Sequence, residues 1–230
     1  ELCSEYLPQF HWSAHAAPPA EPFEALAHPL GFYAVLPSAD WVERALRWGL
    51  RTLQLRIKPE MLPPAELRAQ LRAAVQAAAE VPGAQLFIND HWREAIELGA
   101  YGVHLGQEDI ELADTQALRA SGLRLGVSSH TPLEMSRAHA LRPSYVALGP
   151  VFPTTLKAMR YAPLGLARLR AWTQRLKPHY PVVAIGGIGL DRAPKVWACG
   201  VDAVAVVSAL TQAADPREVA QQFLEGANAS

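Results

Sequence analysis

The feature that most constrains the fold is a regular alternation of two kinds of segment, which begins at Gly31. Short runs rich in β-branched and aromatic residues alternate with longer stretches rich in Ala, Leu and Arg, whose apolar residues recur at helical spacing. Repeated strand–helix units favour a parallel sheet, because two parallel strands need a crossover connection. The predicted strands are Phe32–Leu36, Thr52–Ile57, Gln85–Ile88, Gly102–His104, Arg124–Val127, Tyr145–Leu148, Val182–Ile185 and Ala203–Val207.

This number of units predicts closure into a single (β/α)8 TIM barrel, and a chain of 230 residues lies within the range of one such domain. The alternative is an open, doubly wound sheet, which usually carries a GxGxxG motif after its first strand. Here the first strand leads into Leu36-Pro37-Ser38, which contains no glycine. The barrel is therefore favoured.

Helix-start signals fit this scheme. We expect Asp40 to cap the first helix. Thr131 is expected to cap a later helix with Pro132 in its first turn, and Asp215 to cap the last helix.

Residues 1–30 differ from the rest of the chain because five prolines interrupt any regular element. We therefore divide the chain into an irregular, Pro-rich N-terminal arm, residues 1–30, and a barrel, residues 31–230. The histidines of the arm are interpreted as part of a solvated loop, because no cysteine or acidic residue stands at ligand spacing.

Bulk properties exclude several classes of function. The formal net charge of −1 gives no indication of a nucleic-acid groove or of a contact with an anionic membrane. No apolar run approaches the roughly 20 residues that a membrane span requires, and no secretory signal is recognisable. The two cysteines, Cys3 and Cys199, show no metal-ligand spacing and are few for a disulfide framework. We expect a cytoplasmic protein that acts on small molecules.

In a barrel of this kind the functional groups follow the carboxyl ends of several strands. The second strand ends in Gln54, Arg56 and Lys58, which alternate with apolar residues and should therefore point inward. Arg offers a planar donor fork and Lys a compact charge, a pair suited to phosphate. An ordinary exposed strand with solvated charges is the alternative, but barrel strands have no solvent face. The sequence thus predicts an anion site.

The third and fourth strands place acidic residues at neighbouring ends. Asn89-Asp90 follows the third strand, and Asp109 follows the fourth. Neighbouring strands lie about 4.8 Å apart, so the two carboxylates could converge on one cation. Oxygen ligands of this kind suit Mg²⁺. Alone, Asn89-Asp90 would be interpreted as a turn and helix cap; beside a phosphate-type cation pair, the metal site is favoured.

The remaining strand ends carry hydroxyl, ammonium and glycine groups. Ser128 follows the fifth strand and either binds phosphate or helps to cap the next helix. His104 and His130 have no sequence neighbour that completes a Ser-His-Asp triad, so a hydrolase is disfavoured. The loop after the sixth strand contains Thr154, Thr155 and Lys157.

A second anion site is predicted after the seventh and eighth strands. Gly186-Gly187 and Ser208 occupy the positions at which barrels often bind phosphate through backbone N–H groups. The same rim would thus carry two anion sites, one suited to a diphosphate and the other to a monophosphate.

Taken together, these segments resemble the thiamine-phosphate synthase (thiamine-phosphate pyrophosphorylase) family in its proteobacterial form, from about Gly31 to about Phe223. The segments that carry the resemblance are Gln54-Leu55-Arg56-Ile57-Lys58, Ile88-Asn89-Asp90, Gly102-Val103-His104-Leu105-Gly106-Gln107-Glu108-Asp109, Gly126-Val127-Ser128, Gly149-Pro150-Val151-Phe152-Pro153-Thr154 and Ala184-Ile185-Gly186-Gly187-Ile188. The resemblance implies the (β/α)8 fold and an Mg²⁺-dependent transferase of thiamine biosynthesis. Such an enzyme joins a pyrimidine diphosphate to a thiazole monophosphate by a dissociative substitution.

The resemblance also implies roles for single residues. Asp90 and Asp109 would bind Mg²⁺, and Arg56, Lys58, Ser128 and Lys157 would assist the departure of diphosphate. The substrate-binding residues would be Gln54, Arg56, Lys58, Asn89, Ser128, Thr154, Thr155, Leu156, Lys157, Gly187, Val207 and Ser208.

The chain departs from the family pattern at one position. The family usually reads Pro-Thr-x-Thr-Lys, and Leu156 stands here in place of the second Thr. Two alternatives therefore stay open: a thiazole tautomerase-like isomerase, and a non-catalytic barrel that binds phosphorylated ligands. A homo-oligomer is compatible with the sequence.

Overall fold

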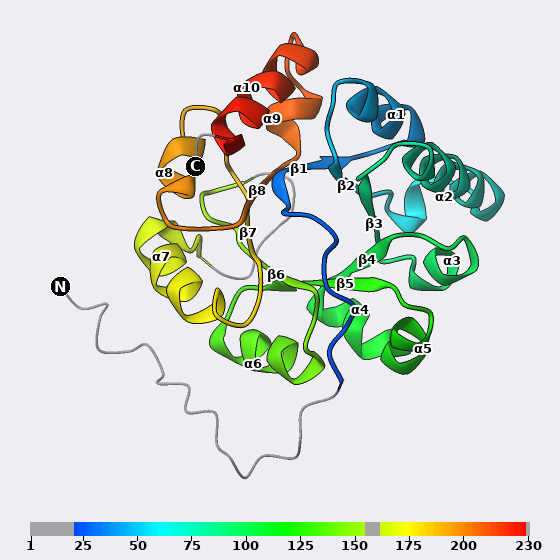
Figure 1. The fold of residues 1–230 in the computed structure, drawn as a ribbon, viewed down its shortest axis with the longest axis horizontal. Helices are drawn as coiled ribbons and strands as arrows, with labels where there is room; N and C mark the ends of the chain where they lie inside the picture. The colour runs from blue at the N-terminus through cyan, green and yellow to red at the C-terminus, as the bar shows by residue number, and fades with distance from the viewer. Residues whose placement is uncertain (1–20, 155–161, 229–230) are drawn as a thin grey trace.

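A computed structural model describes residues 21–154 and 162–228. Parallel strands β1 to β8 form a closed barrel in which each strand pairs with its neighbours in chain order (Figure 1). The strands are β1 Gly31–Leu36, β2 Thr52–Leu55, β3 Gln85–Asn89, β4 Gly102–Leu105, β5 Arg124–Ser129, β6 Tyr145–Leu148, β7 Val182–Ile185 and β8 Ala203–Val206. The (β/α)8 prediction is confirmed, and the doubly wound alternative is excluded.

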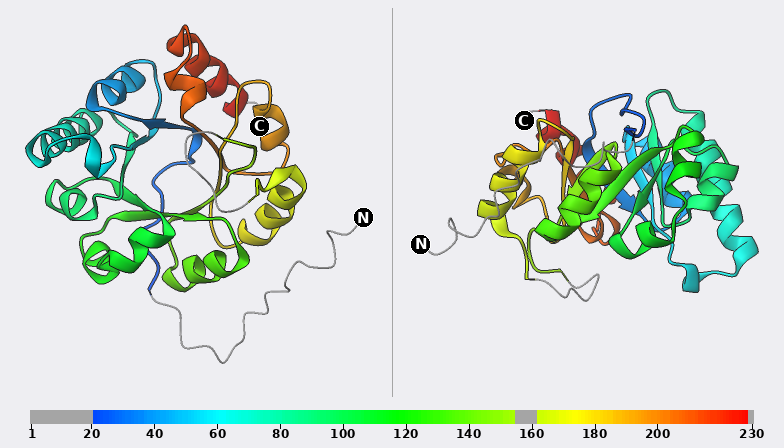
Figure 2. Two further views of the ribbon diagram at one scale, coloured as in Figure 1. Left: turned by 180° about the vertical axis from the view of Figure 1, so that it is seen from behind. Right: turned by 90° about the horizontal axis from the view of Figure 1, so that it is seen from below.

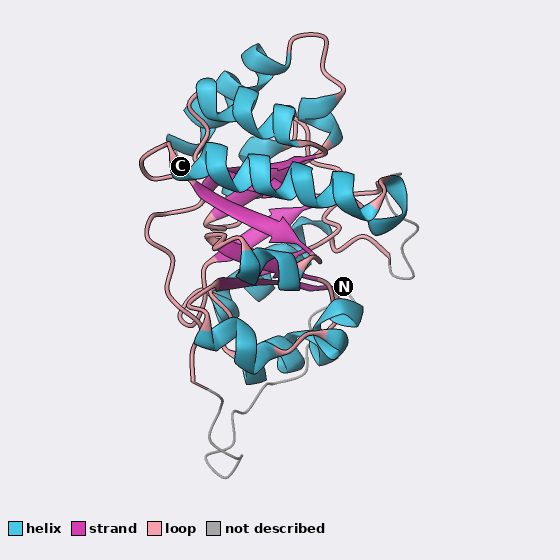
Figure 3. Ribbon diagram, turned by 90° about the vertical axis from the view of Figure 1, so that its right-hand side faces the viewer, coloured by secondary structure: helices cyan, strands magenta, loops and turns pink. Residues whose placement is uncertain are grey.

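Helices surround the ring of strands (Figures 1 and 3). The left view of Figure 2 shows the same arrangement from behind. They are α1 Ala39–Arg47, α2 Pro64–Ala79, α3 Trp92–Glu97, α4 Gln107–Leu112, α5 Thr115–Ala120, α6 Pro132–Leu141, α7 Gly165–Leu176, α8 Ala193–Trp197, α9 Ser208–Thr211 and α10 Pro216–Asn228, with a short 3₁₀ turn η1 at Pro59–Met61. Within the described ranges, no helix is long and apolar enough to cross a membrane.

Helix capping agrees with the sequence at two of three positions. Thr131 Oγ1 accepts a hydrogen bond from the Glu134 backbone N–H, and Asp215 caps α10 by accepting from the Glu218 N–H. The prediction for Asp40 is wrong, because Ser38 caps α1 by accepting from the Trp41 N–H. Asp40 lies already inside the first turn of α1, where its carboxylate pairs with Arg44 at 3.1 Å.

The two faces of the strands form two separate apolar clusters. Outward-facing residues such as Leu53, Leu55 and Ile57 pack under the helices. Inward-facing residues form a cluster around Tyr33, Phe87 and Tyr145. Since three large aromatic rings fill the interior, the barrel is a packed core and not a pore. This alternation directs Gln54 of β2 into the barrel, as predicted, whereas the prediction that Lys58 points inward is wrong, because Lys58 lies beyond the end of the strand and is exposed.

Residues 21–30 contain no helix or strand and cross the amino-terminal end of the barrel (Figure 1, dark blue). Phe23 and Leu30 are buried there, and the Leu30 carbonyl accepts a hydrogen bond from Thr52 Oγ1. Ser144 Oγ donates to the Glu24 carbonyl. The segment closes the end of the barrel that lies opposite the strand carboxyl ends.

Candidate active site

The carboxyl end of β2 carries the first group of predicted site residues. Gln54 is buried inside the barrel, and its Nε2 donates to the Tyr33 hydroxyl at 3.1 Å. Arg56 is half-buried just beyond the strand, held by a 2.8 Å hydrogen bond from its backbone N–H to the Leu36 carbonyl. Lys58 is exposed on the rim, with Nζ 4.0 Å from Glu60 Oε1. The three side chains therefore run from the interior to the rim.

Asp90 and Asp109 are brought together at the ends of β3 and β4. Asn89 is the last residue of β3 and is buried. Asp90 follows it with a left-handed backbone, φ 64°, and its N–H donates to the His104 carbonyl at 3.1 Å. This backbone conformation is one that Asp and Asn tolerate better than most residues. Asp109 lies in the first turn of α4.

The proximity of the two carboxylates is visible in the electrostatics of Asp90. Burial, and secondly the charge and hydrogen bonding of Asp109, raise the pKa of Asp90 from 3.8 to about 6. Arg56 and His91 act in the opposite direction and lower it. The His91 ring is itself held by the Ile57 carbonyl, 2.8 Å from Nε2. The site thus contains a carboxylate pair whose ionisation a cation would favour.

This pair fits Mg²⁺, which typically uses one or two protein carboxylates together with substrate phosphates. Within residues 21–154 and 162–228, no group of three or more His, Cys, Asp or Glu side chains is arranged for a metal ion. A complete cage of protein ligands is therefore absent from this part of the chain. The two carboxylates match a metal ion whose coordination is completed by substrate oxygens, and the Arg56 cation lies nearby.

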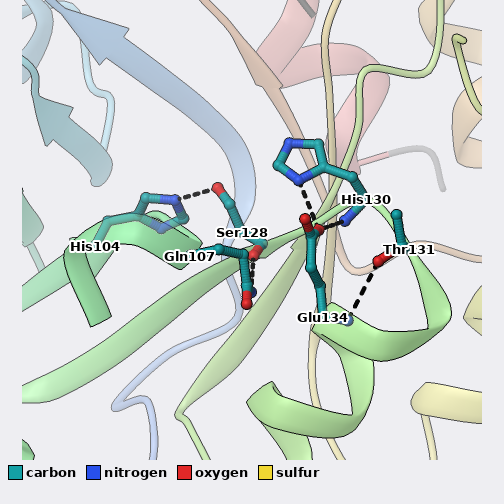
Figure 4. A network of polar contacts seen from close by, with 6 residues as sticks. All are labelled: His104, Gln107, Ser128, His130, Thr131 and Glu134. Carbon is teal, nitrogen blue, oxygen red and sulfur yellow. Dashed lines mark hydrogen bonds and ion pairs between the residues drawn. The ribbon is translucent and has the colours of Figure 1, made fainter. Parts of the chain in front are cut away.

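Ser128 is fixed at the end of β5 by two groups from the β4 side (Figure 4). His104 Nε2 lies 2.8 Å from Ser128 Oγ, and Gln107 Nε2 donates to the Ser128 carbonyl at 2.7 Å. Burial, with a smaller effect of Arg56, lowers the pKa of His104 to about 3, so its ring is neutral. Ser128 therefore presents a positioned hydroxyl at the mouth of the barrel.

His130 has a carboxylate partner that the sequence did not reveal. Glu134 Oε2 accepts from the His130 backbone N–H at 2.5 Å and lies 2.8 Å from its Nδ1 (Figure 4). The Ser128 hydroxyl, however, bonds to His104, whose other nitrogen contacts Tyr145 and not an acid. These contacts do not form a Ser-His-acid triad.

The loop after β6 is held against the loop after β7. Val151 N–H donates to the Ile185 carbonyl at 2.9 Å, and Phe152 N–H donates to the Gly186 carbonyl at 3.0 Å. Gly187 has φ 67°, and a Cβ there would lie 2.6 Å from the Pro153 carbonyl oxygen. Glycine at 187 is therefore required by this close approach, whatever its backbone N–H binds. Thr154 follows directly and is half-buried.

The last predicted positions begin α9. Val207 is its N-cap and Ser208 its first residue, both half-buried at the end of β8. Gly187, Val207 and Ser208 follow neighbouring strands and so share one sector of the rim. Thr155, Leu156 and Lys157 lie outside the described residues.

Comparison with known proteins identifies the family. Residues 33–210 match the family model described as thiamine monophosphate synthase. The chain is 55% identical over 203 residues to the thiamine-phosphate synthase of Cronobacter sakazakii, covering 88% of this chain and 95% of that protein. It is 53% identical over 202 residues to the enzyme of the same name from Salmonella typhimurium, covering 88% and 94%.

The chain belongs to the thiamine monophosphate synthase family.

Solved structures agree with this assignment. A thiamine phosphate pyrophosphorylase from Pyrococcus furiosus superimposes with a TM-score of 0.75 at 31% identity, covering 87% of this chain and 96% of that one. The 3-hexulose-6-phosphate synthase from Salmonella typhimurium superimposes with a TM-score of 0.59 at 15% identity, over 87% and 99%. At that identity the second likeness shows the fold alone.

Within this family framework, sequence reasoning missed the residues beneath the site. Tyr33, His104 and Tyr145 lie inside the barrel and connect Gln54 to Ser128 through hydrogen bonds. The strand alternation that placed Gln54 inward could also have placed Tyr33 and His104 inward. The contacts of Tyr145 with Tyr33 and His104 could not have been predicted from sequence spacing, because they join strands that are not neighbours.

Proposed function

We propose that this protein condenses 4-amino-2-methyl-5-(diphosphooxymethyl)pyrimidine with 4-methyl-5-(2-phosphoethyl)thiazole, or its carboxylate, to give thiamine phosphate and diphosphate. The observation that carries this proposal is the Asp90–Asp109 pair beside Arg56, on the same rim as the Gly187 and Ser208 loops. Membership of the thiamine monophosphate synthase family supports the same reaction. The enzyme is then a transferase of thiamine biosynthesis that moves a pyrimidinylmethyl group.

The pyrimidine diphosphate would occupy the sector formed by β2 to β5. Gln54, Asn89 and Ser128 would bind by hydrogen bonds, and Arg56 and Lys58 would neutralise phosphate charge. The half-buried guanidinium of Arg56 is well suited to this, since its attraction is weakly screened by solvent. Lys157, outside the described residues, would add a further cation.

Asp90 and Asp109 would hold Mg²⁺. When bound, the ion would supply charge stabilisation to the departing diphosphate. Since Asp90 must be ionised to act as a ligand, its raised pKa makes metal binding tighter as the pH rises through about 6.

The thiazole phosphate would occupy the opposite sector. Thr154, Gly187, Val207 and Ser208 would contact its phosphate through hydroxyl and backbone N–H groups. Thr155 and Leu156 would complete this site from the loop after β6.

The chemistry would be dissociative. Negative charge develops on the diphosphate as its bond to the pyrimidine methylene breaks, and Arg56, Lys58, Ser128 and Lys157 would stabilise that charge. The thiazole nitrogen then captures the resulting carbocation. The protein needs no nucleophile of its own, and this fits the lack of a Ser-His-acid arrangement around Ser128.

Three further points belong to the proposal. Residues 31–230 would carry the reaction as one barrel, and residues 1–30 would form an N-terminal arm, of which residues 21–30 cross the far end of the barrel. The enzyme would act in the cytoplasm on small molecules, without nucleic acid or membrane. A homo-oligomer is compatible with it.

The test is incubation of the purified protein with both substrates and Mg²⁺, with thiamine phosphate and diphosphate followed by chromatography. Stoichiometric formation of both products that needs both substrates is expected. Conversion of a thiazole carboxylate phosphate without the pyrimidine or Mg²⁺ would instead identify a tautomerase. Binding of both substrates without any product would identify a silent barrel.

A further inference from the structure

A continuous chain of hydrogen bonds crosses the interior of the barrel from Gln54 to Ser128. Gln54 Nε2 donates to the Tyr33 hydroxyl at 3.1 Å, and this hydroxyl meets that of Tyr145 at 2.8 Å. The Tyr145 hydroxyl lies 2.8 Å from His104 Nδ1, and His104 Nε2 lies 2.8 Å from Ser128 Oγ. The chain thus joins β2, β1, β6, β4 and β5 in turn.

The members below Ser128 are shielded from water. Tyr33 is 1% exposed, Tyr145 0%, Gln54 4% and His104 7%. Leaving a buried donor without an acceptor costs about 1–3 kcal/mol, so the favoured arrangement pairs every hydrogen within the chain. Ser128 differs because it is half-buried at the mouth and can reach a bound ligand.

With the Gln54 amide nitrogen toward Tyr33, hydrogen counting gives the direction of every bond. The Tyr33 oxygen accepts from Gln54, so its own hydrogen must go to the Tyr145 oxygen. The Tyr145 hydrogen then goes to His104 Nδ1, which has to be an unprotonated acceptor. His104 consequently carries its hydrogen on Nε2 and donates it to Ser128 Oγ.

The opposite direction fails for these contacts. If Ser128 donated to His104, then Nδ1 would donate to Tyr145 and Tyr145 to Tyr33. The Tyr33 oxygen would then accept hydrogen bonds from both Tyr145 and Gln54. Neither of these two partners could accept the hydrogen of the Tyr33 hydroxyl itself. That arrangement would bury an unpaired hydroxyl hydrogen, so the first direction is favoured.

We propose that His104 is a positioning residue, which holds Ser128 Oγ as an acceptor and so turns the Ser128 hydroxyl hydrogen outward to an oxygen of the bound diphosphate. The inference rests on the proposed function for the identity of that ligand. Gln107 fixes the Ser128 backbone at 2.7 Å, so the direction of the hydroxyl hydrogen is the remaining freedom of this residue. His104 removes that freedom before substrate binds, which is electrostatic preorganisation.

The first test needs no substrate. Two-bond ¹H–¹⁵N correlation spectra of ¹⁵N-histidine-labelled protein, with His104→Gln to assign the signal, report which ring nitrogen is protonated. The expected result is a neutral ring protonated at Nε2. A ring protonated at Nδ1, as would follow if the Gln54 amide were turned round, overturns the proposal.

The second test asks whether His104 acts through Ser128. A Gln side-chain amide nitrogen can reach the place of His Nε2, whereas that of Asn reaches only the place of Nδ1. His104→Gln should therefore retain a kcat about tenfold higher than His104→Asn. Ser128→Ala should lower kcat by about 100-fold. Adding His104→Asn to Ser128→Ala should lower kcat no further, because the group being positioned is gone.

A merely structural role predicts something different. In that case His104→Asn and His104→Gln would be equally impaired, and the effects of His104→Asn and Ser128→Ala would multiply; either result rejects the proposal. His179→Gln, an exposed histidine of the α7–β7 connection, serves as the matched control. Thermal unfolding of each variant identifies any loss of fold. If the wild-type protein forms no thiamine phosphate, the proposed function fails, and the protonation of His104 still decides the hydrogen-bond direction.

Discussion

The hydroxyl groups of Tyr33 and Tyr145 meet at 2.8 Å inside the barrel, although 112 positions separate the two residues in the chain. Their rings lie edge to face, with centroids 5.9 Å apart, and both pack against Phe87. Below them the buried side chains of Thr52 and Gln85 bond to Leu30 and His28 of the segment that closes the far end. Above them Gln54 and His104 form hydrogen bonds to the two hydroxyl groups, so the tyrosine pair forms the bottom of the candidate active site.

The position of Tyr145 depends on Gly126 of the neighbouring strand. A Cβ at 126 would lie 2.1 Å from Tyr145 Cζ, closer than any packed atoms can lie. Gly126→Ala must therefore displace a buried ring, which we expect to cost about 2 kcal/mol and to lower the Tm by roughly 4–8 °C.

Gly226→Ala is the matched control for this substitution. Its Cβ would meet Trp197 at 3.9 Å, an ordinary contact, and Gly226 lies within α10. Alanine is the better helix former, so the Tm should stay the same or rise slightly. Equal Tm values for the two variants, measured by differential scanning calorimetry, would show that Tyr145 is not fixed by Gly126.

Asp90 should make the stability of the metal-free protein depend on pH. Because its pKa is raised from 3.8 to about 6, protonation stabilises the fold at low pH, and this contribution is lost as the pH rises through about 6. Asp90→Asn keeps a residue that tolerates φ 64° and removes the charge. Its Tm should exceed that of the wild type at about pH 8, and the difference should vanish at about pH 4.

Thermal unfolding in EDTA at a series of pH values checks this prediction. Asp40→Asn is a suitable control, because Asp40 is an exposed acidic residue paired with Arg44 on α1. An Asp90→Asn protein less stable than the wild type at high pH would mean that burial and Asp109 do not disfavour the charge of Asp90.

Gly187 should control the thiazole half of the site. Gly187→Ala would press on the Pro153 carbonyl oxygen at 2.6 Å and shift the loop that carries Thr154. We expect the KM for the thiazole phosphate to rise about tenfold, with that for the pyrimidine diphosphate unchanged. Gly122→Ala has a similar backbone strain, φ 72° against 67°, but no atom within 4 Å of its Cβ. The same KM in both variants would exclude a role for the loop contact.

Leu156 should weaken thiazole phosphate binding, because leucine has no hydroxyl where the family usually has Thr. Leu156→Thr should lower the KM for the thiazole phosphate by about tenfold, the value of one hydrogen bond to a charged group. Leu156→Val, which matches Thr in shape without the hydroxyl, should leave KM as it is. An unchanged or higher KM for Leu156→Thr, in steady-state assays, would contradict this account.

Local patterning predicted most of the fold. The strand repeat specified the barrel, and the alternation along β2 placed Gln54 inside it. Errors arose where neighbouring groups compete: Ser38 and Asp40 are both good caps, and only the backbone at the start of α1 selects Ser38. Strand ends also shifted, since β2 stops at Leu55 where the barrel's pairing ends.

The candidate site was predictable to the extent that it follows strand order. Asp90 and Asp109 were placed together because β3 and β4 are sequential neighbours. The link from Tyr33 to Tyr145 and His104 was not predictable, because it spans strands that do not pair. The partner of His130 was also missed, since Glu134, whose N–H is capped by Thr131, turns its carboxylate to His130.

We propose that Asp90 and Asp109 hold the Mg²⁺ that assists diphosphate departure in a two-substrate condensation. The most direct test of this proposal is a Mg²⁺ titration of thiamine phosphate formation at fixed concentrations of both substrates, by the wild-type protein and by Asp109→Asn. We predict saturable activation of the wild type and a Mg²⁺ requirement at least about tenfold higher for Asp109→Asn. Product formation in EDTA at the full rate, or an identical Mg²⁺ curve for both proteins, would show that Asp90 and Asp109 do not hold a Mg²⁺ needed for the reaction.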